Sequence, residues 1–136
     1  MNKKDKLLTL IPALWTSLFD SIITIVNQPK EYWDGDLDVA NEANSIGYFI
    51  MKQHVSGIFI LCGIWLILIG IIGYYLPKKY SRVFLLFVLM AHTFGAGNWL
   101  IMNYGFWTAI IFVLFNTILF YKIQDLINRK SVKIGI

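Results

Sequence analysis

The chain has 136 residues, of which 57% are hydrophobic and 15% charged, and its mean hydropathy is +0.63. Soluble domains contain roughly 45–50% apolar residues, so this composition excludes an ordinary soluble domain. The formal charge of +4 does not indicate nucleic-acid binding, because the basic residues form short clusters that flank the apolar blocks. With Cys62 as its one cysteine, the chain can form neither an internal disulfide nor a cysteine-based metal site.

Four apolar blocks follow one another along the chain, at about residues 7–27, 54–76, 82–102 and 106–123. Each is close to the ~20 residues that a helix needs to cross the hydrocarbon core of a bilayer. Only helices satisfy every backbone hydrogen bond in lipid over spans of this length. We therefore predict an all-α fold, a four-helix transmembrane bundle that forms a single integral membrane domain over residues 1–136. The first block follows a basic start but lacks a small-residue cleavage site, so we interpret it as an uncleaved helix.

The basic residues indicate the orientation of these helices. Lysine and arginine concentrate before the first span, between the second and third, and after the fourth. The 28–53 connection instead carries five acidic residues, and the 103–105 turn carries no charge. By the positive-inside rule, both termini lie in the cytoplasm, the 28–53 loop lies outside, and the protein is integral to a cytoplasmic-type membrane with the lipid bilayer as a partner. The basic clusters comprise Lys3, Lys4, Lys6, Lys78, Lys79, Arg82, Lys122, Arg129, Lys130 and Lys133.

The 28–53 connection is long for a small bundle, and its second half has few helix breakers. We predict an extra short helix between the first two spans, over about residues 39–52. Such a segment is too short to cross the bilayer, so it lies at the outer interface or dips partway into the membrane, where protein or water covers its backbone. A surface helix that only caps the bundle is an equally good interpretation.

An aspartate interrupts the first span. Asp20 lies seven residues below the outer end of that span, or ~10 Å deep at ~1.5 Å per residue. A charged aspartate near the bilayer centre costs ~2.5–3.5 kcal/mol on insertion scales, so we expect it to face the bundle interior or to be protonated. Ser17, Ser21 and Thr24 lie within one helical turn of Asp20 and extend a polar stripe along the same side.

The third span carries a matching anomaly. His92 lies near mid-membrane at about the depth of Asp20, and Asn98 lies nearer the outer surface. Small residues four apart on both helices allow a close approach, which would bring Asp20 and His92 together. Asn116 contributes a polar group from the fourth span. Further groups stand at the outer mouth: Glu42, Asn44 and His54.

These polar residues permit several kinds of site. A buried carboxylate and imidazole can bind or relay an ion or proton, and intramembrane carboxylates are functional-site candidates. Carboxylate and imidazole groups are also ligands for divalent metals such as zinc, although no close ligand spacing occurs here. A serine hydrolase would need a nucleophile elbow, which the sequence lacks. In the simplest alternative, Asp20 and His92 only hydrogen-bond across helices and hold the bundle together.

The pattern Asp20-x3-Thr24, followed by Glu42-x-Asn44 before a short apolar helix, resembles a family of small, uncharacterised prokaryotic multi-pass membrane proteins. In that family the first helix carries Asp-x3-Thr and the next segment begins Glu-x-Asn-Pro, whereas here Ser45 stands in place of the proline. The resemblance covers about residues 7–102. It implies that Asp20, Thr24, Glu42 and Asn44 form one site.

We predict a non-enzymatic polytopic membrane protein with a buried polar cavity in its outer half, which binds or passes a small ligand or ion. One alternative is an intramembrane metal-dependent hydrolase that uses the same residues as ligands and base. Another is a structural subunit of a membrane complex or homo-oligomer. The sequence does not identify a cofactor. The predicted ligand-binding residues are Asp20, Thr24, Glu42, Asn44 and His92, and the supporting polar residues are Ser17, His54, Asn98 and Asn116.

Overall fold

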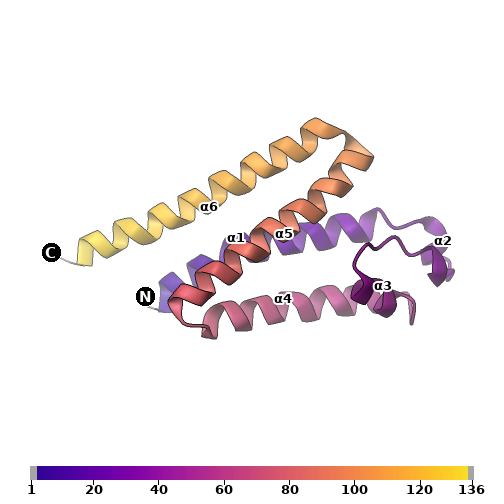
Figure 1. The fold of residues 1–136 in the computed structure, drawn as a ribbon, viewed down its shortest axis with the longest axis horizontal. Coiled ribbons are helices and arrows are strands. Elements are labelled where there is room, and N and C mark those ends of the chain that lie inside the picture. The colour runs from indigo at the N-terminus through magenta and orange to yellow at the C-terminus, as the bar shows by residue number, and fades with distance from the viewer. Residues whose placement is uncertain (1–2, 135–136) are drawn as a thin grey trace.

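The computed structural model describes residues 3–134, with side chains as far as residue 129, and contains no strand over that range (Figure 1). Its four long helices are each long and apolar enough to cross a membrane, which confirms the predicted all-α bundle. Three short helical segments lie between the first two long helices. In chain order the elements are α1 (Lys3–Val26), α2 (Lys30–Trp33), the 3-10 helix η1 (Leu37–Val39), α3 (Ser45–Met51), α4 (Gly57–Tyr75), α5 (Lys78–Tyr104) and α6 (Phe106–Ile134).

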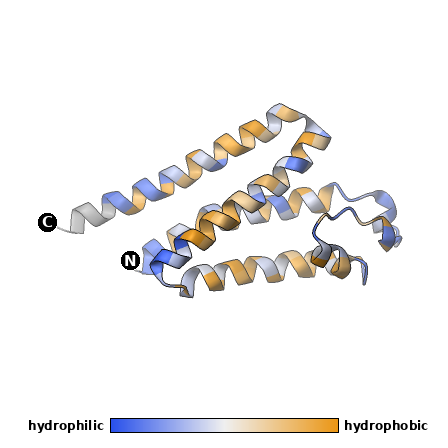
Figure 2. Ribbon diagram, in the orientation of Figure 1, coloured by the Kyte–Doolittle hydropathy of each residue, from blue (hydrophilic) through white to orange (hydrophobic). Residues whose placement is uncertain are grey.

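The bundle has two chemically different ends. The start of α1, the α4–α5 turn and the C-terminal part of α6 lie at one end, here called the terminal end (Figure 1). The short elements α2 and α3 lie at the other, the loop end, with the α5–α6 turn on the same side. Figure 2 shows hydrophobic residues along the middle of the long helices and hydrophilic residues at both ends. The apolar middle and hydrophilic ends of the bundle match the layers of a bilayer. Both ends of the described chain lie at the terminal end.

Three of the long helices extend past the predicted spans, and α1 begins at Lys3, four residues before the expected residue 7. The third span was expected at 82–102, but α5 begins at Lys78, directly after Pro77, whose φ of −54° suits the residue before a helix. The fourth was expected at 106–123, but α6 extends to Ile134; the side chains of Lys130 and Lys133 lie outside the described residues. Gly105 joins the two helices with φ 91°, a conformation that favours glycine. Hydropathy locates the membrane segment, whereas the helix itself ends at the turn.

Helices α1 and α5 form the centre of the bundle, because each of them contacts the other three long helices. In the terminal half, Leu10 and Ala13 of α1 pack with apolar residues of α4 and α5. In the loop half, Ile23 packs against α5 and α6. The long helices pack closely at Gly73 of α4, where an added Cβ would lie 2.6 Å from Leu10 Cδ2 and 2.7 Å from Leu85 Cδ2.

The connection between α1 and α4 is folded back over the loop end and held by buried polar side chains. The phenol of Tyr32, which is fully buried, donates a hydrogen bond of 3.2 Å to the Val55 carbonyl. The Gln28 amide pairs with both backbone groups of Asn41, accepting from its N–H and donating to its carbonyl at 2.9 Å each. Residues 40–44 are consequently fixed as an irregular segment against the bundle.

The predicted helix over residues 39–52 is present but half as long, since α3 covers only Ser45–Met51. Its start is set by Asn44, whose side chain accepts the Ile46 N–H at 3.0 Å. The residues before Asn44 do not continue the helix, because side chains bond their backbone N–H groups. Gln28 accepts the N–H of Asn41, and the Glu42 carboxylate accepts the N–H of Asn44 at 2.7 Å. Side chains that bond nearby backbone groups compete with helix formation in this way.

Candidate functional site

Asp20 of α1 and His92 of α5 meet inside the bundle. The His92 Nδ1 lies 2.7 Å from Asp20 Oδ2, and the two side chains are only 17% and 18% exposed. The two residues are 72 positions apart in the chain, so the contact depends on the packing of α1 along α5. The structure thus turns the carboxylate towards a partner on another span and away from the lipid, as the depth of both residues predicted.

The second ring nitrogen of His92 fixes the tautomer of the imidazole. Trp65 Nε1 of α4 lies 2.7 Å from His92 Nε2. An indole N–H can only donate, so Nε2 accepts and the ring proton sits on Nδ1, from which it is donated to Asp20. Asp20 is then the acceptor of a charge-assisted hydrogen bond, with His92 neutral. One imidazole links three membrane-crossing helices, α1, α4 and α5.

Ser17 approaches the same nitrogen, with its Oγ 3.3 Å from His92 Nε2. The order Asp20–His92–Ser17 has the connectivity of a hydrolytic triad. However, Ser17 is fully buried and does not line the cavity beside Asp20, so a substrate carbonyl could not reach its hydroxyl. The Trp65 N–H also occupies the nitrogen that would take the serine proton. Ser17 therefore contacts the His92 ring but does not reach the cavity.

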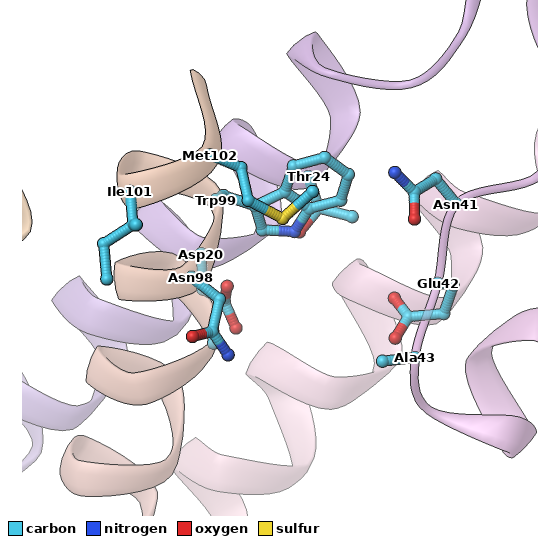
Figure 3. Close-up of a pocket in the computed structure, with 10 residues that line it drawn as sticks. Asp20, Thr24, Asn41, Glu42, Ala43, Asn98, Trp99, Ile101 and Met102 are labelled. Atoms are coloured by element: carbon cyan, nitrogen blue, oxygen red, sulfur yellow. The ribbon is translucent and has the colours of Figure 1, made fainter. Parts of the chain in front are cut away.

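A cavity of about 370 Å³ opens beside Asp20 at the loop end of the bundle (Figure 3). Helix α1 contributes Asp20 and Thr24, and residues 41–43 of the connection form the facing wall. Figure 3 shows Asp20 and Asn98 on one side of this space and Glu42 on the other. Gly95 of α5 makes room for the carboxylate, since an added Cβ would lie 3.0 Å from Asp20 Oδ2. The remaining lining residues are Asn41, Ala43, Trp99, Ile101 and Met102.

The charge of this cavity is negative. Its lining includes two carboxylates and no lysine, arginine or histidine. Burial raises the pKa of the Glu42 carboxyl above its ordinary value of 4.5, and the nearby charge of Asp20 raises it further, against the backbone N–H groups of Asn44 and Ala43, which lower it. The cavity therefore concentrates negative charge in partly dry surroundings without a cation to balance it.

The other predicted residues are distributed in three ways. Thr24 and Asn98 line the cavity, and Thr24 is buried. Asn44 lies next to the cavity wall but uses its side chain to cap α3. His54 and Asn116 lie elsewhere: His54 is exposed and bonds Ser56, while Asn116 is buried and donates to Thr93. The structure therefore does not bring His54 or Asn116 together with Asp20.

Sequence patterns did not single out two residues that shape the site. Trp65 is a tryptophan in the middle of a span, away from the interfaces where this residue is enriched, and its N–H requires a partner at that depth. The position of Trp65 in the sequence therefore indicates that its N–H bonds a partner inside the bundle. Gln28 lies two residues after the end of α1, and its role in holding Asn41 depends on the folded connection, for which the sequence carries no comparable signal.

Metal binding receives no support from the arrangement. Over the residues with described side chains, no three histidine, cysteine, aspartate or glutamate groups gather where they could hold a metal ion. A larger apolar cavity, of about 510 Å³, runs between α5 and α6, and no charged residue lines it. Of these two cavities, only the one beside Asp20 is lined by charged residues. No family model, curated protein or solved structure matches this chain.

Proposed function

We propose that this multi-pass membrane protein binds or passes a small polar ligand or ion through the loop-end cavity, with Asp20 as the group that contacts it. The observation that carries the proposal is the state of the Asp20 carboxylate. One oxygen is held by His92, while the described residues give the other, Oδ1, no hydrogen-bond donor, and the side chain lines the cavity. A carboxylate held on one side and open on the other is prepared for a ligand.

A purely structural pairing of Asp20 with His92 would not require a cavity. The volume of about 370 Å³ falls within the ~300–1,000 Å³ that is usual for small-molecule sites. Carboxylates in membrane spans carry a large insertion cost and commonly mark ion or substrate sites. The combination of an intramembrane carboxylate, an adjacent cavity and a second carboxylate on its opposite wall favours ligand binding over helix association alone.

The basic clusters favour an outer location for this cavity. They lie at the start of α1, at the start of α5 and in the C-terminal part of α6, all at the terminal end. The positive-inside rule then puts the terminal end in the cytoplasm and the loop end outside. The cavity would open towards the outer solution, and Asn41, Glu42 and Ala43 would form its rim.

The proposal is tested by thermal unfolding of purified protein in detergent with a panel of small cations, anions and neutral polar molecules. A ligand that binds only the folded state stabilises it by about 2.7 kcal/mol at 100 times its Kd. We expect at least one class of ligand to raise the Tm of the wild type and to have no effect on Asp20→Asn. Asp125→Asn is the matched control, since it makes the same change at a partly exposed residue paired with Arg129. If every ligand acted equally on Asp20→Asn and the wild type, the proposal would be wrong.

A further inference from the structure

We infer that the ligand of the Asp20 cavity is a small organic cation, of the class of protonated aliphatic amines. The inference rests on the proposed function and specifies its ligand. It is drawn from the two opposed carboxylates, the size of the cavity, and its apolar wall.

The lining of the cavity contains acidic residues and no basic ones. Asp20 and Glu42 reach the cavity from opposite sides, and no basic residue lines it (Figure 3). The nearest lysine along the connection, Lys52, is paired with Asp38 at 2.5 Å and does not neutralise either carboxylate. Two carboxylates that face one partly buried space repel an anion and favour a cation.

The Asp20 cavity is large enough for a small molecule. A volume of about 370 Å³ corresponds to roughly twelve water molecules at ~30 Å³ each. A bare calcium ion instead needs about 6–8 oxygen ligands at ~2.3–2.6 Å, which requires converging side chains. The described side chains provide no group of three acidic, histidine or cysteine residues that could hold a metal. The space suits a molecule of several non-hydrogen atoms better than a single ion.

Apolar side chains and two amides form the other walls of the Asp20 cavity. Trp99, Ile101 and Met102 of α5 give the cavity an apolar side, and Figure 3 shows the Trp99 ring and the Met102 thioether beside it. An aromatic ring attracts an organic cation through its π face, and the apolar side chains cover a short hydrocarbon chain. The side-chain carbonyls of Asn41 and Asn98 can accept N–H bonds, and an ammonium group has three to donate. A protonated amine with a short carbon chain uses all of these walls.

The test is a binding titration in detergent with 1,4-diaminobutane and its neutral isostere 1,4-butanediol, followed by calorimetry and by Tm. We expect the diamine to bind and the diol not to bind. Glu42→Gln and Asp20→Asn should each weaken diamine binding about 10–100-fold, because a hydrogen bond to a charged group is worth about 1.5–3 kcal/mol. Trp99→Leu should weaken it severalfold, while Trp99→Phe retains a π face. Glu31→Gln, at an exposed residue, is the control for Glu42→Gln.

Acetate and calcium chloride complete the set of probes. If acetate, calcium or the diol raised the Tm in a way that Asp20→Asn abolished, and the diamine did not, the amine inference would be overturned while the proposed function survived. If no probe in this set or in the wider panel depended on Asp20, both would fall. Equal diamine binding by the wild type and Glu42→Gln would also overturn the inference. Glu42 lies outside the long helices, so its variant carries the test even if Asp20→Asn does not fold.

Discussion

The bond between Asp20 and His92 makes a quantitative prediction for stability. Its N–O distance is 2.7 Å, and the Trp65 contact assigns the shared proton to His92. Hydrogen bonds to charged groups contribute about 1.5–3 kcal/mol, whereas polar bonds between membrane helices average about 0.6 kcal/mol. Asp20→Asn keeps one acceptor oxygen for His92, removes the negative charge and replaces the second oxygen with an NH2 group. We therefore expect the coupling free energy between Asp20→Asn and His92→Ala to be about 1–2 kcal/mol.

The single substitutions have separate expected costs. His92→Ala removes the donor to Asp20 and the acceptor of the Trp65 indole, which leaves two polar groups without their partners. Leaving a buried polar group without its partner costs about 1–3 kcal/mol, and more for a charged group, so we expect a loss of about 2–3 kcal/mol. Trp65→Phe removes a neutral donor and should cost about 0.5–1.5 kcal/mol.

The assay is reversible unfolding in mixed micelles, with the free energy of unfolding measured for the wild type, each single variant and each double variant. A second cycle, between Trp65→Phe and His92→Ala, is the internal control because it shares His92 but contains no charge. The Asp20–His92 coupling should be clearly the larger of the two. A coupling near zero, or one no larger than that of the Trp65 cycle, would refute the assignment of a neutral His92 that donates to an ionised Asp20.

Three further predictions follow from the packing and from the connection. Gly73→Ala should lower the free energy of unfolding by about 1–3 kcal/mol, because its Cβ would overlap leucines of α1 and α5. Gly70→Ala is the control in the same denaturation series and should be neutral or slightly stabilising, because the space at its Cβ is open. Equal effects of the two substitutions would contradict the packing described at Gly73. The raised pKa of Glu42 means that the folded state binds its proton more tightly than the unfolded state. The contribution of Glu42 to stability should therefore be fully present below pH 4.5 and be lost as pH rises through the raised pKa, and Glu42→Gln should remove this component from a pH series of Tm values. Gln28→Leu should speed hydrogen exchange at the Asn41 amide, which loses its 2.9 Å acceptor, and unchanged exchange there would show that the connection is held by other contacts.

The sequence predicted those features of the fold that depend on hydropathy and depth. The spans follow from apolar blocks of the length of a bilayer, and helices α1, α4, α5 and α6 match them. The contact of Asp20 with His92 was accessible because both residues are unfavourable in lipid and lie at similar depths. Their ligand-binding role stays a prediction, as does the resemblance that grouped Asp20 with Thr24, Glu42 and Asn44.

Features set by tertiary contacts of the connection could not be predicted in the same way. The irregular segment at residues 40–44 exists because Gln28 reaches across to Asn41, and helix propensity alone favoured a longer α3. His54 was expected near the cavity from its depth, but the chain turns so that its ring bonds Ser56 at the surface. Depth along a span can be counted from the sequence, whereas the direction of a loop side chain depends on folded contacts.

The central claim is that the Asp20 carboxylate turns inward and accepts the Nδ1 proton of a neutral His92. Solid-state NMR in bilayers tests it most directly, with nitrogen-15 in histidine and carbon-13 in the aspartate carboxyl groups, in a His54→Gln background that leaves one histidine. We expect a protonated Nδ1, an unprotonated Nε2, and a strong dipolar coupling from Nδ1 to one aspartate carboxyl carbon that disappears in Asp20→Asn. A protonated Nε2, or no coupling between the imidazole and any aspartate, would contradict the claim.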